Sequence, residues 1–371
     1  MSISVLLISN GFQPSYEKGF ANGVAENEVR VELVSSDRTL AKWLDPRIKN
    51  NNLRGSQDPG RPPTVKAANL IRYAFALGKR IRSGNFDVVH LIGLFMTRNN
   101  AGGLIEWVVY RLLARRFFMT VHDLLPHNQH TRFNKLIFRI LYQLPDKLVV
   151  HTEKMRDGLM TQFGVPAHRI IIMQHGVDEL PARLRVPEVS KSLRVLLFGG
   201  LSRYKGIDLL FDALQQCQDL LVEVVIAGEC RDAVYMHEIA RLISGMSSNH
   251  TVQWDKTFIA EEKVGVFFET VDAVVLPYRH IDQSGVLLTA FRFGTPVIAT
   301  DVGAFRSCLP DFAGMIVPEQ TPQSLAHTLH EFSDRKNEFD RARIRRHAQS
   351  LAWPLTVQPL ITEYKALRQE R

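Results

Sequence analysis

Two segments of this sequence carry residue types that bind phosphate. The first, RVLLFGGLSRYKGIDLLFDAL at residues 194–214, places Gly200, Arg203 and Lys205 between an apolar run and an expected helix. Glycine lets a ligand approach the backbone closely, and arginine and lysine bind phosphate oxygens through a planar fork and a mobile point charge. The segment alone is a weak indication of a diphosphate site, because a tight turn with solvated charges has the same pattern.

The second segment, VDAVVLPYRHIDQSGVLLTAFRFGTPVIATDVG at residues 271–303, predicts strand, loop, helix, turn and strand. Residues 273–276 are a short apolar run that Pro277 stops, and a helix is expected to open at Gly285 after Ser284. The first turn of a helix attracts anions, because its free N–H groups and its dipole both favour negative charge. Together the two segments favour a ligand that carries phosphate.

A polar pair, His122 and Asp123, follows the apolar run FMTV in the first half of the chain. Open α/β sheets bind ligands at the carboxyl ends of their strands, which makes the position of this pair informative. An isolated histidine is more often structural than functional. The functional interpretation of His122 and Asp123 therefore rests on their position after a strand, since a histidine alone would not indicate function.

Strand-like and helix-like segments alternate along the chain, which indicates an α/β fold with largely parallel sheets. The first series has strands expected at residues 3–9, 29–35, 87–92, 117–122 and 147–151, with helices at 16–27, 64–83, 102–115 and 133–143. The second has strands expected at residues 194–198, 221–227, 251–254, 273–276, 297–300 and 314–317. The pattern loosens into a linker near residues 183–187. We therefore expect domains at 1–184 and 185–354, and a C-terminal helix at 355–371 that can cross back to the first domain.

The composition is that of an ordinary globular protein, with 45% hydrophobic and 23% charged residues. The apolar run at the N-terminus is too short for a membrane span and lacks the basic flank of a signal peptide. Three scattered cysteines suggest neither a disulfide framework nor a zinc site. We expect a cytoplasmic protein, with contact at the inner face of the membrane left open.

The net charge of +8 is concentrated in the first half, where residues 1–180 hold 24 Lys and Arg against 15 Asp and Glu. Basic surfaces attract nucleic acids, anionic membranes or anionic substrates. Nucleic acid is disfavoured, because no known module interleaves these charges with stacking aromatics. Residues 132–142 mix cations with apolar side chains at helical spacing, and two interpretations remain. Either this helix lies at a membrane, or it packs on the core through its apolar side chains, Leu136, Ile137, Ile140 and Leu141.

The two phosphate-binding segments resemble the donor half of a family 4 type glycosyltransferase of the GT-B fold. The run HTEKMRDGLMTQFGVPAHRIIIMQHGVD at residues 151–178 is similar to the same family, and the match covers most of residues 115–320. The resemblance implies two Rossmann-like, doubly wound domains that face each other across a cleft, with the acceptor in the first and the nucleotide sugar in the second. It implies a hexosyltransferase, usually retaining. The implied donor is UDP- or GDP-linked, and the acceptor is a glycan or a lipid-linked molecule, as in polysaccharide biosynthesis.

The resemblance also assigns the donor site. Arg203 and Lys205 match the family's basic pair on the donor diphosphate, where they would neutralise charge on the leaving nucleotide. The implied donor contacts are Gly200, Arg203, Lys205, Asp282, Ser284, Gly285, Val286 and Thr289. With two cations and a helix N-terminus available, we expect that no metal and no cofactor is needed.

In the first domain, His122 matches the family's histidine beside the reacting sugar, where it can bind a sugar hydroxyl. Four further residues are candidates for acceptor contacts: Gly11, Tyr16, Glu17 and Asp123. Plain helix capping is the alternative for Tyr16 and Glu17, and Asp123 can orient His122 or cap the segment that follows.

The chain departs from the family pattern at one place. The family usually has two glutamates about two helical turns apart, and alignment through the run GTP at residues 294–296 puts Ile281 and Thr289 at those positions. Asp282 stands one residue after the first. A carboxylate on the donor ribose is therefore in doubt. The alternatives are a non-catalytic sugar-nucleotide-binding or scaffold homologue, and a nucleotide-sugar epimerase or inverting transferase on the same fold.

Overall fold

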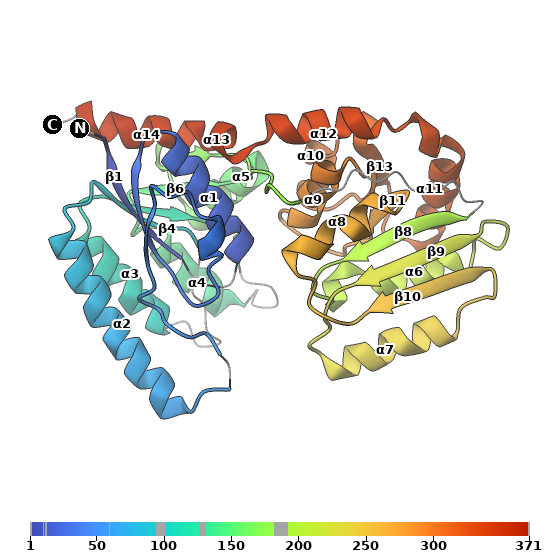
Figure 1. The fold of residues 1–371 in the computed structure, drawn as a ribbon, viewed down its shortest axis with the longest axis horizontal. Helices are drawn as coiled ribbons and strands as arrows, with labels where there is room; N and C mark the ends of the chain where they lie inside the picture. The colour runs from blue at the N-terminus through green and yellow to red at the C-terminus, as the bar shows by residue number, and fades with distance from the viewer. Residues whose placement is uncertain are drawn as a thin grey trace. The chain divides into compact units, whose positions relative to one another are not determined.

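The protein divides into two compact units, each built on a parallel sheet with helices on both faces (Figure 1). Unit 1 consists of Met1–Gly176 and Leu351–Arg371, and unit 2 of Val177–Ser350. The computed structural model describes residues 2–9, 11, 13–58, 60–93, 101–125, 131–181 and 192–369. The predicted linker at residues 183–187 lies outside these ranges. The described chain has no helix long and apolar enough to cross a membrane.

The sheet of unit 1 has the strand order β3-β2-β1-β4-β5-β6-β7, and its described strand pairs are all parallel. Its strands are β1 (Ser4–Ile8), β2 (Arg30–Val34), β3 (Lys49–Asn51), β4 (Val88–Leu91), β5 (Phe117–Thr120), β6 (Lys147–Val150) and β7 (Ile170–Ile172). Its helices are α1 (Pro14–Glu26), α2 (Pro63–Ser83), α3 (Ala101–Leu113), α4 (Arg132–Leu141), α5 (Glu153–Phe163), α13 (Trp353–Thr356) and α14 (Gln358–Gln369). The central strands are buried on both faces and mostly apolar, as is usual for parallel strands that lie between helices.

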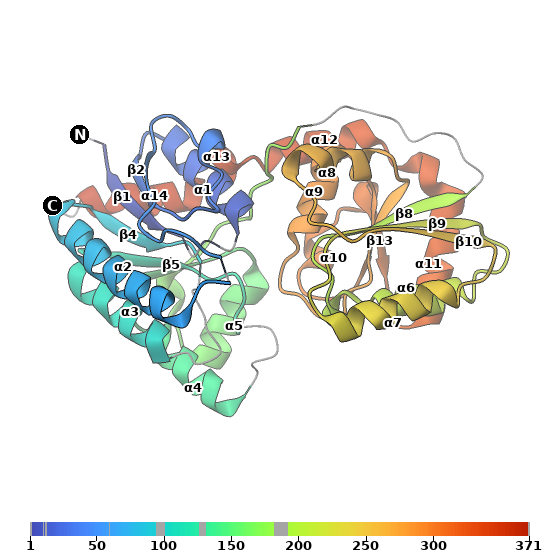
Figure 2. The same cartoon turned by 60° about the horizontal axis from the view of Figure 1, so that its bottom comes forward.

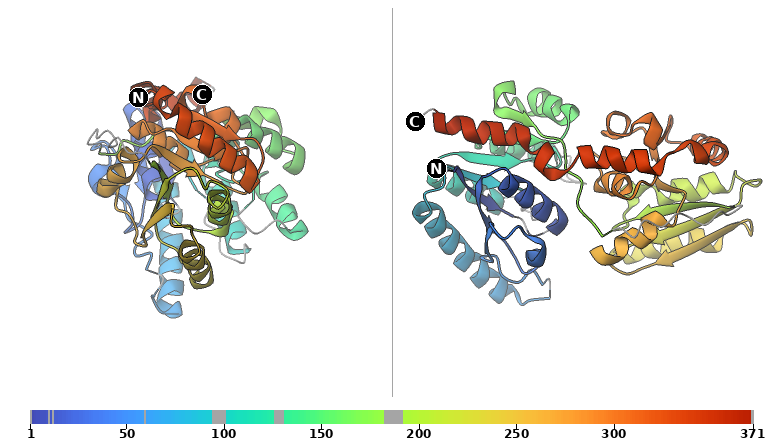
Figure 3. Two further views of the ribbon diagram at one scale, coloured as in Figure 1. Left: turned by 90° about the vertical axis from the view of Figure 1, so that its right-hand side faces the viewer. Right: turned by 45° about the horizontal axis from the view of Figure 1, so that its top comes forward.

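Two apolar clusters hold the helices of unit 1 to opposite faces of its sheet. On one face, α1, α13 and α14 pack over β1 through side chains such as Phe20, Trp353 and Tyr364. The C-terminal helix, red in Figure 3, runs along this sheet. On the other face lie α2, α3, α4 and α5, and in Figure 2 α2 and α3 are side by side. The C-terminal segment is thus part of the core of unit 1.

The sheet of unit 2 has the order β10-β9-β8-β11-β12-β13 and is likewise parallel in its described pairs. Its strands are β8 (Leu193–Phe198), β9 (Val222–Ala227), β10 (His250–Asp255), β11 (Ala273–Leu276), β12 (Val297–Thr300) and β13 (Gly314–Val317). Its helices are α6 (Ile207–Leu214), α7 (Ala233–Ser244), α8 (Glu261–Glu269), α9 (Gly285–Phe293), α10 (Phe305–Cys308), α11 (Pro322–Arg335) and α12 (Arg341–Ser350). The strand order reverses between β8 and β11, and such a switch point is where open α/β sheets bind ligands.

The packing of Trp353 shows which residues on either side of unit 2 belong to unit 1. Trp353 lies so close to Gly176 that a Cβ atom there would be 2.2 Å from the indole ring, so both residues belong to unit 1. The chain leaves unit 1 after Gly176 and returns to it at Leu351. From the sequence we expected the first boundary between residues 184 and 185 and the second between residues 354 and 355. The short strands β3 and β7 had no counterpart in the prediction.

Candidate active site

The turn after β8 brings a buried lysine against the backbone of Gly199. Lys205 lies in a short 3₁₀ turn (Arg203–Lys205), and its Nζ donates a hydrogen bond of 2.6 Å to the carbonyl of Phe198 at the end of β8. Only 5% of Lys205 is exposed, and burial lowers the pKa of its ammonium to about 8. An ammonium buried without a neighbouring carboxylate is energetically unfavourable, and such groups are typical of sites that bind an anion.

The helix N-terminus predicted from the sequence adjoins this lysine. A Cβ atom on Gly199 would lie 3.1 Å from Lys205 Nζ and 3.8 Å from Val286 Cγ2, so the turn after β8 and the first turn of α9 meet at Gly199. The space above Gly200 and above Gly285 is open. A phosphate in this space can receive charge from the ammonium and hydrogen bonds from free helix N–H groups.

Two polar groups fix the loop that leads into α9. The Ser284 hydroxyl caps the helix by accepting a hydrogen bond of 3.4 Å from Leu287 N. The backbone N–H of Arg279 donates to the carbonyl of Tyr204 at 2.7 Å, which ties this loop to the turn after β8. The two segments that carry the phosphate-binding residues are therefore held together by backbone contacts.

Arg203 points to a different partner. Its Nη1 and Nη2 donate to the two carboxylate oxygens of Glu238 on α7, at 2.6 and 2.7 Å, and its guanidinium stacks 4.9 Å from the ring centroid of Tyr235. Its side chain is largely exposed, so the ion pair is screened by water. Of the predicted cationic pair, the structure places Lys205 at the start of α9 and pairs Arg203 with Glu238.

The positions of the family's glutamates hold other contacts. Thr289 donates its hydroxyl hydrogen to the carbonyl of Gly285 one turn earlier, at 2.9 Å. Asp282 is half-buried, and its carbonyl accepts from Ala304 N at 3.2 Å. Gln283, between Asp282 and Ser284, was not predicted as a site residue; its Oε1 is buried and has no hydrogen-bond partner in the described part of the chain. A ligand hydroxyl or amine can donate to this oxygen.

A cavity of about 540 Å³ opens beside Gly199 and Gly200. Its other walls come from the loops after β9 and β10, through residues that include Glu229, Asp232 and Phe258. Its lining combines apolar surface with a few charged groups, as is usual in sites for organic ligands. Its place at the β8 end makes it the natural continuation of the anion site.

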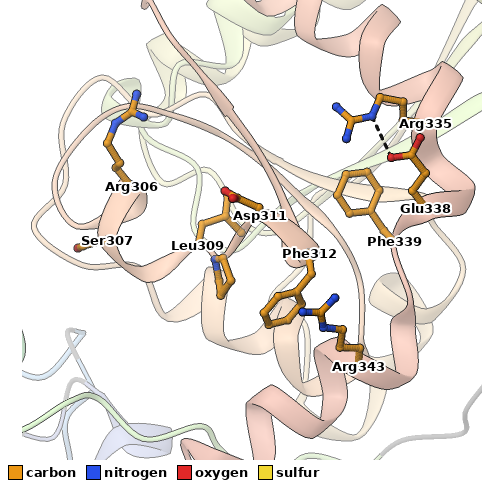
Figure 4. A pocket seen from close by; sticks show the side chains of 10 residues that line it. Arg306, Ser307, Leu309, Asp311, Phe312, Arg335, Glu338, Phe339 and Arg343 are labelled. Carbon is orange, nitrogen blue, oxygen red and sulfur yellow. Dashed lines mark hydrogen bonds and ion pairs between the residues drawn. The ribbon is translucent and has the colours of Figure 1, made fainter.

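A larger hollow of about 750 Å³ lies elsewhere in unit 2 (Figure 4). Its arginines are already engaged: Arg335 bonds to Glu338, and Arg343 stacks on Phe312 at 4.2 Å. None of the predicted site residues lines this hollow. Volume alone therefore does not locate the site.

In unit 1, three histidines follow three neighbouring strands and surround one tyrosine. His122, His151 and His175 come after β5, β6 and β7, and their ring centroids lie 4.4, 5.6 and 5.1 Å from that of Tyr16 on α1. Trp353 closes the group at 5.0 Å from Tyr16. Of this group, only Tyr16 and His122 were predicted as site residues. The signal for His151 was available, since it ends the strand expected at residues 147–151, whereas the strand before His175, β7, was not predicted.

The three histidines are electrically neutral at neutral pH. Each has one ring nitrogen against a backbone carbonyl, so that nitrogen carries the hydrogen: His122 Nε2 donates to Ile92 O at 3.0 Å, His151 Nδ1 to Met173 O at 2.9 Å and His175 Nδ1 to Gly176 O at 2.7 Å. Burial lowers the pKa of all three, that of His175 to about 4. The second ring nitrogen of each is therefore an acceptor, and His151 Nε2 is buried without a hydrogen-bond partner in the described chain. Such a group suits a ligand with hydroxyl donors.

The remaining candidates of unit 1 lie around this group or beside it. Glu17 is buried, and desolvation raises the pKa of its carboxyl against the opposing effects of Ser9, Thr39 and Arg54. Gly11 has a left-handed backbone (φ 75°) and packs on Ser36. Asp123 is half-buried beside His122. In the described chain, no cluster of three or more His, Cys, Asp or Glu side chains could hold a metal ion.

Two family models match this chain and together span most of it. The model described as "Glycosyltransferase Family 4" matches residues 18–179, and the model described as "Glycosyl transferases group 1" matches residues 192–334. The first covers the histidine group of unit 1 up to His175, and the second covers the anion site of unit 2.

Among curated proteins, the chain is similar to enzymes named D-inositol 3-phosphate glycosyltransferase. That of Geodermatophilus obscurus is 25% identical over 242 residues, which cover 61% of this chain and 53% of the relative. That of Catenulispora acidiphila is 25% identical over 382 residues, covering 93% and 88%. In the first of these alignments, the match spans about half the length of the relative.

Solved structures show the same fold. Sucrose-phosphate synthase from Thermosynechococcus elongatus has a TM-score of 0.76 at 16% identity, with both chains fully covered. The Anabaena protein HepE in complex with UDP and glucose has a TM-score of 0.72 at 16% identity, covering 98% of this chain and 99% of its own. At such identities the likeness establishes the architecture and leaves the ligands of this chain to be argued from its own residues.

Proposed function

Because this chain belongs to the family 4, group 1 glycosyltransferases and has the GT-B fold, we propose that it transfers a sugar from a nucleotide diphosphate sugar to an acceptor hydroxyl. The observation that carries the proposal is the buried ammonium of Lys205 beside the first turn of α9. Within the described chain no carboxylate pairs with this ammonium, so a diphosphate would supply the missing negative charge.

We assign the donor to unit 2. The open space over Gly200 and Gly285 accommodates the diphosphate, and the adjoining cavity beside Glu229 and Phe258 is large enough for a nucleoside. The solved complex of HepE with UDP and glucose supports a UDP-linked donor, and a GDP-linked donor fits the same description. Lys205 and the helix amides would do the work of a divalent cation, so no metal and no cofactor enters this proposal.

The reaction breaks the bond between the anomeric carbon and the phosphate oxygen of the donor. Negative charge then develops on that oxygen, and Lys205 and the N–H groups at the start of α9 stabilise it, which is usually the largest catalytic contribution. We propose that the sugar is a hexose transferred with retention, and that the leaving phosphate itself accepts the proton of the acceptor hydroxyl. A protein general base is then unnecessary.

We assign the acceptor side to unit 1. His122 offers a ring nitrogen to a sugar hydroxyl, and the neutral histidines around Tyr16 suit a polyol better than an anion. A glycan or a lipid-linked acceptor, as in polysaccharide biosynthesis, fits this chemistry. The names of the relatives suggest D-inositol 3-phosphate as a second acceptor to test.

A non-catalytic sugar-nucleotide-binding protein is the main competing function, because Ile281 and Thr289 stand where the family usually has glutamates. An epimerase on the same fold is the other. Both predict donor binding, and they differ from glycosyl transfer only in what happens to the bound sugar.

The test begins with a thermal-shift screen of UDP- and GDP-sugars, since a ligand bound only by the folded state raises its stability. The donor found there is then incubated with glycans, lipid-linked acceptors and D-inositol 3-phosphate, and NMR follows the anomeric configuration. We expect release of nucleotide with a new glycosidic bond that retains the donor configuration. Binding without turnover on any acceptor would favour the non-catalytic protein, and a changed sugar without transfer would favour the epimerase.

A further inference from the structure

The outer surface of the helical layer of unit 1 exposes large apolar side chains that no described residue of the unit covers. Five of them, each more than half exposed, define what we call the outer helical face: Ile71, Phe75, Phe133, Leu136 and Ile140. Phe75 and Phe133 are the extremes, at 77% and 70% exposed. Single exposed apolar residues need no explanation, but a series of them on neighbouring helices marks an interaction surface.

Helix α2 contributes Ile71 and Phe75 to this face. It buries only Tyr73, Leu77 and Ile81, which repeat at every fourth position along its second half. The earlier turns bury no side chain, and Leu70 and Ile71 lie there in the open. The helix therefore extends beyond the core that holds it.

Helix α4 has apolar residues on two sides. Phe138 and Leu141 enter the core, whereas Phe133, Leu136 and Ile140 follow one another along the exposed side. The core-packing interpretation of this helix is thus wrong for Leu136 and Ile140, which are exposed. It is confirmed for Leu141, and Ile137 is partly buried against the same core.

Both helices present their exposed sides on the same face of the sheet. The buried residues of α2 and those of α4 belong to one apolar cluster over the β4 and β5 strands, with α3 between them in the layer. The side opposite those buried residues points away from the sheet in each helix, and helical spacing puts the five residues of the outer helical face on that side. Leu70 instead continues the buried stripe of α2 beyond the core and is not part of this face.

Charge on these helices has a single sign. Neither α2 nor α4 contains an aspartate or a glutamate, whereas α2 carries Lys66, Arg72, Lys79, Arg80 and Arg82 and α4 carries Arg132, Lys135 and Arg139. The three cations of α4 are exposed among its exposed apolar residues. Long basic side chains beside Phe, Leu and Ile are the composition of helices that lie in the interface of an anionic bilayer.

We propose that the outer helical face docks unit 1 on the surface of a membrane that contains anionic lipid. The apolar side chains enter the region between head groups and acyl chains, and the exposed cations of the two helices bind the lipid phosphates. Arg80 is not among them, because its guanidinium donates to the carboxylate of Glu32. A bilayer complements both properties at once, because it offers a broad apolar layer beneath a negatively charged surface. The proposal does not depend on glycosyl transfer, since neither helix carries a residue of the candidate active site.

The test is flotation of the full-length protein with vesicles of phosphatidylcholine alone or with phosphatidylglycerol added. We expect binding to the anionic vesicles that weakens with salt. Removing two cations in the Lys135→Gln, Arg139→Gln variant should lower it about twentyfold or more, since each cation near the surface contributes about fivefold. The Phe133→Ser, Leu136→Ser, Ile140→Ser variant should lower it at least tenfold. Because all five side chains are exposed, we expect both variants to keep the thermal midpoint of the parent.

The matched control replaces exposed apolar residues of unit 2, in the Leu221→Ser, Val234→Ser variant, which should bind vesicles like the parent. Equal loss in this control, or absence of binding to anionic vesicles, would overturn the proposal. So would a parent protein that sediments as a dimer and becomes monomeric in the α4 triple variant without any change in vesicle binding, since the face would then join two copies of the chain. An unchanged rate of donor hydrolysis in the α4 variants would show that they lose membrane binding without losing the active site.

Discussion

The two units have sheets of the same kind, yet the carboxyl ends of their strands carry opposite chemistry. In unit 2 this edge holds a buried ammonium and the positive end of a helix, at Lys205 and Gly285. In unit 1 it holds neutral rings, with His122, His151 and His175 around Tyr16. The sheet fixes where a ligand can lie, and the side chains that follow each strand decide whether that ligand is an anion or a polyol.

Removal of Lys205 should have the largest effect of any single change. In Lys205→Ala we expect turnover to fall about 10² to 10³-fold, because one preorganised group on the leaving oxygen is worth about that much. Initial rates with the donor found in the screen give the measurement. Lys256→Ala, which removes an exposed lysine of unit 2 that stacks on Trp254, is the control and should keep the rate of the parent. A fully active Lys205→Ala protein would contradict the assignment of the donor diphosphate to the site beside Lys205.

Replacing His122 should impair the acceptor site that we assign to unit 1. In His122→Ala we expect kcat/KM to fall about 10- to 100-fold, because leaving a sugar hydroxyl without its hydrogen-bond partner costs about 1–3 kcal/mol. Nucleotide affinity by calorimetry should stay constant, because the residue lies in unit 1 and the nucleotide is assigned to unit 2. His327→Ala, at an exposed histidine of α11, is the control. Loss of nucleotide affinity in His122→Ala would argue against a division of donor and acceptor between the units.

Acid should destabilise unit 1 through its neutral histidines. A fourth histidine, His90, lies buried within β4, and burial lowers its pKa to about 3 from an ordinary value of 6.5, because it disfavours the charged form. Its contribution is complete above pH 6.5 and is lost as pH falls from there toward 3. At pH 5 this one residue costs about 2 kcal/mol of the free energy of unfolding, and His151 acts in the same direction.

Urea unfolding at pH 7 and pH 5, followed by tryptophan fluorescence, measures this loss. Three of the four tryptophans, Trp43, Trp107 and Trp353, report on unit 1. A His90→Gln variant should show a smaller difference between the two pH values. Equal stability of the parent at both would contradict the neutral state inferred for these rings.

Donor binding should weaken at high pH, whereas the stability of unit 1 is lost at low pH. The pKa of Lys205 is about 8, and a bound diphosphate favours the charged ammonium, so donor affinity is constant below pH 8 and falls above it. From pH 7 to pH 9 we expect about a tenfold loss. Calorimetry with UDP or GDP across this range gives the profile. In Lys205→Met the profile should be flat, and an unchanged slope there would assign the titration to another group.

The smallest expected effect concerns Arg203, which Glu238 holds in the free protein. If Arg203 turns to the diphosphate when the donor binds, Glu238→Gln removes a competitor and should raise donor affinity about threefold, in keeping with the weakness of an exposed ion pair. Calorimetry on Glu238→Gln and on Glu331→Gln, an exposed glutamate of α11 paired with Arg335, makes the comparison. An unchanged affinity would leave Lys205 as the cation of the site.

Much of the fold was predictable from sequence because parallel strands buried on both faces are short apolar runs, such as residues 273–276 and 297–300. A shared phosphate site for the Gly199 turn and the start of the helix at Gly285 was predicted, because both segments carry phosphate-binding residue types. The structure brings Gly199 to Val286, where both segments follow strands at the switch point. The edge strand β3 escaped prediction because KNN is polar, and an edge position does not demand apolar residues. The pairing of Arg203 with Glu238 also escaped, since it joins residues from two elements whose separation only the fold defines.

The path of the chain through the units has a consequence for the order of synthesis. Unit 1 is interrupted by all of unit 2, and its core includes Trp353, Leu360 and Tyr364, which follow unit 2 in the chain. On the ribosome, unit 2 has its complete sequence before unit 1 does, so it can fold while the sheet of unit 1 still lacks the helix that covers one face. A nascent chain that ends at Ser350 would hold a finished unit 2 beside an unfinished unit 1, and the histidine group would be the last part of the molecule to form.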